Sequence, residues 1–159
     1  MQEKHPKDLL RNLSFFYWVM LLSLVTFIVA SAIYINKLGP ALGIDPQAHY
    51  IVNITVILLI IVIAPISYIL PQKMIAAIDR SLPLEEKLIR YRLPLFVRYF
   101  FMDTAGFSIA VGFILTGNTN LILMQAIVML FFIIYKPTPF KIAADLELND
   151  NEKQKLMSE

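Results

Sequence analysis

The sequence contains no cysteine, which excludes disulfide bonds, thiol redox chemistry and cysteine-ligated metals. Its two histidines, His5 and His49, lie outside the apolar stretches and far apart in the sequence. A histidine-ligated metal or haem site within this chain alone is therefore not expected. The sequence also lacks a Gly-rich phosphate loop, paired carboxylates and a nucleophile with a nearby base. We therefore expect no cofactor and no catalytic residue, and predict that the protein is not an enzyme.

Charged residues are also scarce: they make up 16% of the 159 residues, against about a quarter in soluble domains. Hydrophobic residues make up 58%, and the charges that exist are segregated between long apolar stretches. This segregation is typical of a membrane protein rather than of a nucleic-acid-binding protein. The sequence therefore predicts an all-α integral membrane protein that contacts the lipid bilayer and binds no nucleic acid.

Four apolar stretches are candidates for transmembrane helices, since roughly 20 residues suffice to cross a bilayer. In lipid every backbone group must be satisfied internally, so even the second stretch, rich in Ile and Val, is predicted to be helical. Turns at 36–49 and at Gly117–Asn120 divide the stretches into two hairpins. The last stretch is the shortest, so it either includes residues of the preceding turn or lies in a locally thinned bilayer. The predicted spans, within a transmembrane domain over 15–136, are about 15–35, 50–70, 95–116 and 120–136.

The first apolar stretch has a rival interpretation as a secretory signal. It follows a basic segment, and Ala30-Ser31-Ala32 resembles a cleavage site. The stretch is long for a signal core, however, and the uncharged Ile33-Tyr34-Ile35 continues it beyond the cleavage point. These features favour a retained transmembrane helix.

The distribution of Lys and Arg predicts the orientation. The N-terminal segment 1–14 carries three, the first turn one, residues 70–103 around the connector six, the second turn none and residues 136–159 four. Because cytoplasmic segments are enriched in Lys and Arg, both termini and the connector are predicted to be cytoplasmic. The seven tyrosines and Trp18 fall near the predicted boundaries, as interfacial aromatic residues do. We expect a multi-pass protein of the cytoplasmic (inner) membrane of a prokaryote.

The connector, residues 71–94, is predicted to form two amphipathic helices on the membrane surface. Met74, Ile75, Ile78 and Leu82 recur at helical spacing, and a second helix is expected to begin at Pro83 and to end at Pro94. Basic residues of this region are predicted to contact lipid headgroups or a partner protein. They are Lys73, Arg80, Arg90, Arg92 and Arg98.

The tail, residues 137–159, is predicted to form one or two short cytoplasmic helices. Thr138 followed by Pro139 is typical of an N-cap and first turn, and Asn149 with Glu152 is typical of a second capping pair.

Asp103 is the only acidic residue inside a predicted span. It lies about 20 Å from the outer boundary, and hence about 10 Å inside the cytoplasmic interface. A carboxylate there must be paired, hydrogen-bonded or protonated. Folding the second hairpin predicts a contact of Asp103 with Lys136 or Tyr135. This contact is either a structural clamp between helices or part of a proton or cation relay.

Small residues recur every four positions along the third span, at Thr104, Ser108, Gly112 and Thr116. Such rows let helix backbones approach closely in lipid. The row is predicted to be a packing face, either within the four-helix bundle or toward another subunit.

Three functions are compatible with these features. The first is an accessory, assembly or scaffold subunit of a larger membrane complex, bound to other membrane subunits or to copies of itself. The second is an oligomeric proton- or cation-coupled transporter that uses Asp103. The third, a lipid- or quinone-handling enzyme, is disfavoured because candidate catalytic residues are missing.

Overall fold

A computed structural model describes residues 6–43 and 45–157. Residues 1–5 of the predicted N-terminal segment, residue 44 of the first predicted turn and residues 158–159 of the predicted tail lie outside this range. The described residues form six helices. They are α1 (Pro6–Leu38), α2 (Pro46–Ala76), α3 (Leu84–Thr116), α4 (Asn120–Ile134), α5 (Pro139–Asp145) and α6 (Asp150–Met157).

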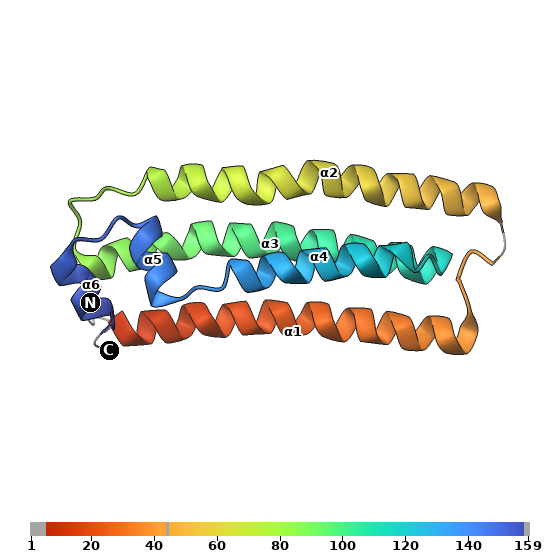
Figure 1. Cartoon of the computed structure of the whole chain (residues 1–159), viewed down its shortest axis with the longest axis horizontal. Helices are drawn as coiled ribbons and strands as arrows, with labels where there is room; N and C mark the ends of the chain where they lie inside the picture. Colours follow the sequence, from red (N-terminus) through yellow and green to blue (C-terminus); the bar gives the residue numbers. More distant parts are fainter. Residues whose placement is uncertain (1–5, 44, 158–159) are drawn as a thin grey trace.

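Helix α3 is the central element of the bundle. Helices α1 and α2 run along opposite sides of it, and α4 lies alongside it between them (Figure 1). The start of α1, the α2–α3 turn and the short helices α5 and α6 all lie at one end of the bundle, which we call the basic end (Figure 1). The three predicted Lys/Arg-rich segments therefore meet there, and the turn between α3 and α4 lies at the opposite end.

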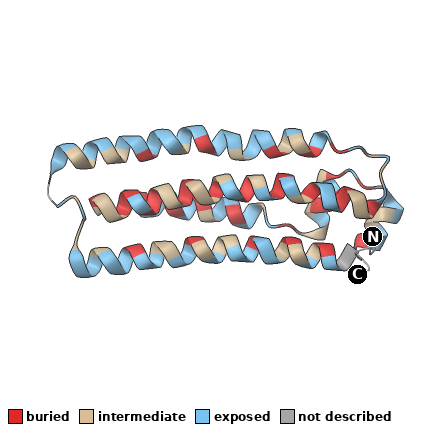
Figure 2. Cartoon of the chain, turned by 180° about the vertical axis from the view of Figure 1, so that it is seen from behind, coloured by how far each residue is buried: buried red, intermediate tan, exposed pale blue. Residues whose placement is uncertain are grey.

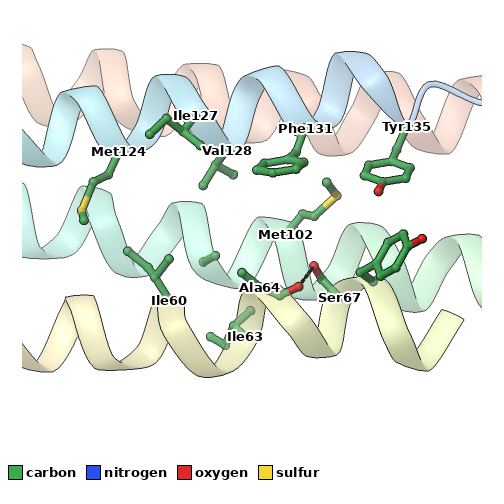
Figure 3. Close-up of a pocket in the computed structure, with 12 residues that line it drawn as sticks. Ile60, Ile63, Ala64, Ser67, Met102, Met124, Ile127, Val128, Phe131 and Tyr135 are labelled. Carbon is green, nitrogen blue, oxygen red and sulfur yellow. Dashed lines mark hydrogen bonds between the residues drawn. The ribbon is translucent and has the colours of Figure 1, made fainter. Parts of the chain in front are cut away.

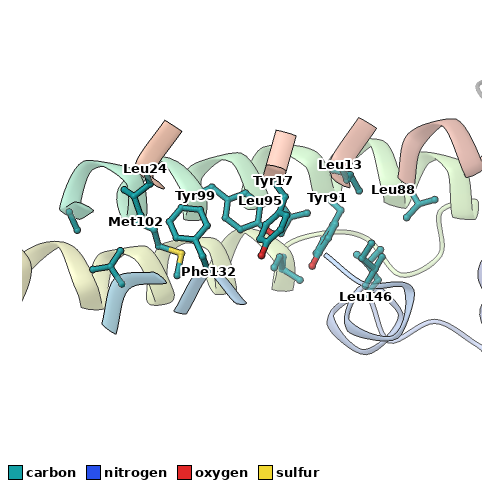
Figure 4. Close-up of a cluster of buried hydrophobic side chains, with 14 of the residues drawn as sticks. Leu13, Tyr17, Leu24, Leu88, Tyr91, Leu95, Tyr99, Met102, Phe132 and Leu146 are labelled. Atoms are coloured by element: carbon teal, nitrogen blue, oxygen red, sulfur yellow. The ribbon is translucent and has the colours of Figure 1, made fainter. Parts of the chain in front are cut away.

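Burial follows the same arrangement. Buried residues are dense along α3, whereas α1 and α2 are exposed over most of their surface (Figure 2). The core is built of aliphatic and aromatic side chains from α1, α2, α3, α4 and the tail (Figure 4). The rings of Tyr17, Tyr99 and Phe132 pack together there, with centroids 5.7–6.4 Å apart; Tyr99 and Phe132 are stacked, and Tyr17 meets Tyr99 edge-on.

Three of the helices are long and apolar enough to cross a membrane, namely α1, α2 and α3. The number rises to four if α4 and α5, which meet at a bend of 80°, are counted as one span. The all-helical fold and the presence of several candidate membrane spans are thus confirmed. Because α1 and α2 expose apolar side chains along their length, lipid is a more favourable environment for them than water.

Local sequence explains where the helices begin and end. The Asp45 side chain accepts a hydrogen bond from the backbone of Gln47 at 3.0 Å and caps α2, whose first residue is a proline. Gly117 ends α3 with a φ of +66°, a conformation that favours glycine. The predicted tight turn at Gly117–Asn120 is confirmed, because α4 begins at Asn120.

Both predicted caps in the tail are also confirmed. The Thr138 side chain accepts a hydrogen bond from the Lys141 backbone at 3.2 Å, at the start of α5. Asn149 and Glu152 form a reciprocal capping box: the Asn149 side chain accepts from the Glu152 backbone at 2.9 Å, and the Glu152 carboxylate accepts from the Asn149 backbone at 3.0 Å.

The predicted pair of amphipathic surface helices between the hairpins is not confirmed. Residues up to Ala76 belong to α2, a short turn follows, and α3 begins at Leu84, as expected after Pro83. Helix α3 then continues through Pro94 instead of ending there. Leu88 and Tyr91, in the segment expected at the membrane surface, are fully buried, in the same core as residues of α5 and α6.

Candidate functional site

The most polar buried region of the chain lies at the basic end, where the tail covers the start of α3. We call α5 and α6 together the tail cap. The Lys87 ammonium, only 3% exposed, donates to the Glu152 carboxylate at 2.7 Å. This charge-assisted contact joins α3 to α6. Since a buried ammonium without its anion is costly, the pair holds the tail cap against the bundle.

Glu152 makes two kinds of contact, and they determine its pKa. Partial burial on its own would raise the pKa of this carboxyl. The hydrogen bonds from Lys87 and from the Asn149 backbone outweigh that effect and hold the pKa below its ordinary value. The carboxylate is therefore ionised at neutral pH and forms both contacts in that state.

A second contact joins the tail cap to α3 one turn further along. The Tyr91 hydroxyl donates to Asp145 at 2.6 Å, and Lys141 forms an ion pair with the same carboxylate at 3.3 Å. Asp145 thus has two partners. Its charge is compensated within the cap.

Arg98 corrects our prediction of a membrane-surface contact. Its side chain is buried, at 1% exposure, instead of reaching the interface. The guanidinium lies over the ring of Tyr135, with its carbon 4.6 Å from the ring centroid. Its Nε and Nη2 atoms are buried and have no hydrogen-bond partner among the described residues. The guanidinium is therefore a buried charge without an anionic partner among the described residues.

The other predicted surface cations lie nearer to solvent. Lys73 and Arg90 are exposed, and Arg90 pairs with Glu86 within α3 at 2.7 Å. Arg80 is half-buried and lies 3.7 Å from Glu147 of the tail. Arg92 is also half-buried and lines an apolar groove of about 340 Å³ between α1 and α3. Whether these four contact lipid or a partner stays a prediction.

Asp103 does not form the predicted contact with Lys136 or Tyr135. It is half-buried and accepts a long hydrogen bond, 3.5 Å, from Ser23 of α1, while its Oδ1 atom is buried without a partner among the described residues. The Lys136 ammonium lies 5.4 Å from the ring centroid of Trp18. The Tyr135 ring packs on Arg98 instead. Hairpin geometry alone could not reveal that Asp103 faces α1 rather than α4.

The row of small residues on α3 divides into two parts. At Gly112 a Cβ atom would lie 2.8 Å from Val56 of α2, and Thr116 is buried, so this part packs inside the chain. Thr104 and Ser108 are only half-buried and line a shallow groove between α3 and α2. Their hydroxyls donate to carbonyls one turn back at 2.8 Å, so the outward surface is small and weakly polar.

No group of three or more His, Asp or Glu side chains in the described ranges could hold a metal ion. Comparisons with protein-family models, with curated proteins and with solved structures found no match to this chain. The function must therefore be argued from the geometry.

Proposed function

We propose that this chain is a non-enzymatic accessory, assembly or scaffold subunit of a larger complex in the cytoplasmic (inner) membrane of a prokaryote. In this proposal four helices span the membrane as two hairpins, and the basic end, with both termini, faces the cytoplasm. Helix α4, with 15 residues, is about 22 Å long and lies in a thinned bilayer. The positive-inside rule and the gathering of Lys/Arg-rich segments at one end support this orientation.

One observation carries the proposal: α3 is covered by α4 on one side and left open on the other. The open side lies between α1 and α2 (Figure 2), and Thr104 and Ser108 line its groove beside α2. Shallow grooves that include Ser108 and Phe107 flank it. A transmembrane helix of a partner can approach α3 closely here because the side chains are small.

The tail cap supports the same function. Its ion pair and hydrogen bonds fix α5 and α6 to α3, so a protein bound to the cap is held at a defined position relative to the membrane helices. A scaffold subunit requires such a rigid connection between its cytoplasmic and transmembrane surfaces.

Site-specific crosslinking in native membranes tests the proposal directly, because the natural chain has no cysteine. Thr104→Cys and Ser108→Cys place single thiols on the open side of α3. Leu123→Cys, at an exposed position of α4, is the matched control. We expect both α3 variants to crosslink to one partner of discrete mass, and the control to give no such product.

Other crosslinking results would contradict the proposal. Equal products from Leu123→Cys would mean that contact is nonspecific, and no product from either α3 variant would mean that this side faces lipid only. A product of twice the chain mass would identify a homo-oligomer and would favour the second candidate function.

That second candidate is an oligomeric proton- or cation-coupled transporter that uses Asp103. The buried, unpartnered Oδ1 atom of Asp103 favours it. The amide of Gln125 on α4 is also buried without a partner among the described residues, 3.1 Å from where a Cβ atom on Gly106, one turn along α3 from Asp103, would lie. Together these groups form a small polar region inside an apolar bundle.

The substitution Asp103→Asn separates the two candidates. The amide keeps an acceptor for Ser23, so we expect folding to change by less than about 1 kcal/mol and crosslinking at position 108 to persist. We also expect vesicles that contain the wild-type protein to show no proton or Na⁺ flux above empty vesicles. A flux that the wild type supports and the folded variant lacks would replace the scaffold function with transport.

A further inference from the structure

A second groove, between α2 and α4, has the shape of a site for a lipid chain. Its volume is about 320 Å³, and α3 forms its floor with Met102 and Ala105 (Figure 3). It extends along α4 from Met124 to Tyr135, about 16 Å, which is close to the ~15 Å depth of one leaflet of the hydrocarbon core.

The groove is almost purely apolar along its length. Ile60 and Ile63 of α2 face Ile127 and Val128 of α4 across it (Figure 3). The Ser67 hydroxyl donates to the Ala64 carbonyl at 2.7 Å and is therefore already satisfied. Such apolar walls favour contact with a hydrocarbon chain over contact with water.

The end of the groove that lies toward the basic end is different. Tyr68 and Tyr135 line it, with their rings 6.3 Å apart. Arg98 lies against the same Tyr135 ring and does not itself line the groove, but it is one helical turn from Met102, which does. The unpaired guanidinium thus adjoins the end of the apolar groove.

No carboxylate among the described residues forms an ion pair with this guanidinium. Asp145 is shared by Tyr91 and Lys141, Glu152 pairs with Lys87, and Glu147 lies beside Arg80. The Lys141 ammonium lies 5.7 Å from the Tyr135 ring centroid. Lys141 and Asp145 cancel, so the charge of Arg98 remains and matches one phosphodiester group.

We propose that the α2–α4 groove binds one acyl chain of an anionic glycerophospholipid, whose phosphate pairs with Arg98. A guanidinium and a phosphate match in geometry as well as in charge. The site is separate from the open side of α3 that we propose for a partner helix, and it rests only on the membrane orientation proposed above. Loss of the partner and loss of the lipid are therefore distinguishable.

Native mass spectrometry of the full chain, released from detergent, tests this site. The probes are phosphatidylglycerol and phosphatidylcholine with identical chains, and glycerol phosphate without chains. We expect one phosphatidylglycerol per chain, bound at least about tenfold more tightly than phosphatidylcholine, the scale of one or two charge-assisted hydrogen bonds. Glycerol phosphate should not displace it, because the chain contributes to the affinity.

Two variants and a matched control locate the site. Arg98→Gln should abolish the preference for phosphatidylglycerol. Arg92→Gln, on the same helix but in the α1–α3 groove, should leave it unchanged. Ala64→Trp fills the α2–α4 groove from an exposed position and leaves Arg98 intact, so it should reduce binding of both lipids.

Several results would overturn the proposal. Equal binding of the two lipids by the wild type would remove the charge recognition. Loss of the preference in Arg92→Gln with retention in Arg98→Gln would place the lipid between α1 and α3. Displacement by glycerol phosphate would identify an anion site without a chain. If Arg98→Gln does not fold, the results with Ala64→Trp and with glycerol phosphate still test whether the lipid chain binds in the α2–α4 groove.

Discussion

Three charged side chains of α3 have interaction partners of different kinds. They are Lys87, Arg98 and Asp103. Lys87 has a full counter-charge in Glu152, Arg98 has an aromatic ring in place of an anion, and Asp103 has one long hydrogen bond. The cost of burying a charge depends on its partner more than on its depth. Arg98 and Asp103 are therefore the positions where a ligand has most to contribute.

Glu152 makes the docking of the tail cap dependent on pH. Its pKa in the folded chain lies below its ordinary value of 4.5, so its contribution is complete above about pH 4.5 and is lost as the pH falls through the lowered pKa. We expect amides of α6 to lose protection from hydrogen exchange in that range, after correction for intrinsic rates.

The matched variant is Glu152→Gln. Without the carboxylate, docking should be weaker by about 1–3 kcal/mol at neutral pH, and the acid-dependent change should disappear. An acid transition that persists in this variant would assign the effect to another group.

Individual helices follow from the sequence better than their contacts do. Apolar length predicts α1, α2 and α3, and side-chain chemistry predicts the caps at Thr138 and Asn149. Pro94 misled the prediction because proline usually ends a helix, whereas here α3 continues through it. The burial of Tyr91 depends on Asp145, 54 positions later, and no local pattern contains that contact.

The rotation of a helix about its own axis also cannot be predicted from the local sequence. Hairpin geometry predicts which residues of the two helices lie at the same depth along the bundle, and it predicted that Asp103 lies near Lys136. It does not predict which neighbour each residue faces, since a change of one residue turns the side chain by 100°. Asp103 faces Ser23, and Arg98, expected to reach the membrane surface, faces Tyr135 inside the bundle. These two differences account for most of what the sequence left undetermined at the candidate site.

The close contact of α1 with α3 depends on Gly106. A Cβ atom at this position would collide with the side chain of Leu24, which is itself buried. We expect Gly106→Leu to separate the two helices and to lower stability by about 1–3 kcal/mol or more, as overpacking does. Thermal unfolding in detergent measures this.

Ala126→Leu is the control for that experiment. It adds a side chain of the same size at an exposed position of α4 and should leave the unfolding temperature almost unchanged. An equal loss in both variants would mean that α1 is not packed on α3 through Gly106.

The orientation of the whole molecule in the membrane can be measured. A reporter fused after Glu159 should give a cytoplasmic signal, and a reporter inserted at Gly117–Asn120 should give an external one, because α6 and the α3–α4 turn lie at opposite ends of the bundle. An external signal after Glu159 would mean an odd number of spans. An internal signal from the turn would mean that α4 does not cross the membrane.

The central position of α3 has a consequence for synthesis. Helices α1 and α2 emerge from the ribosome first, yet both pack on α3, which is made later. Until α3 is synthesised, α1 and α2 therefore lie in the bilayer as two separate helices. During this time membrane proteases can cleave them. A fragment that ends at Pro83 should be degraded quickly in cells, and co-expression of residues 84–159 should protect it. If the fragment is long-lived alone, α1 and α2 have a stabilising contact that does not require α3.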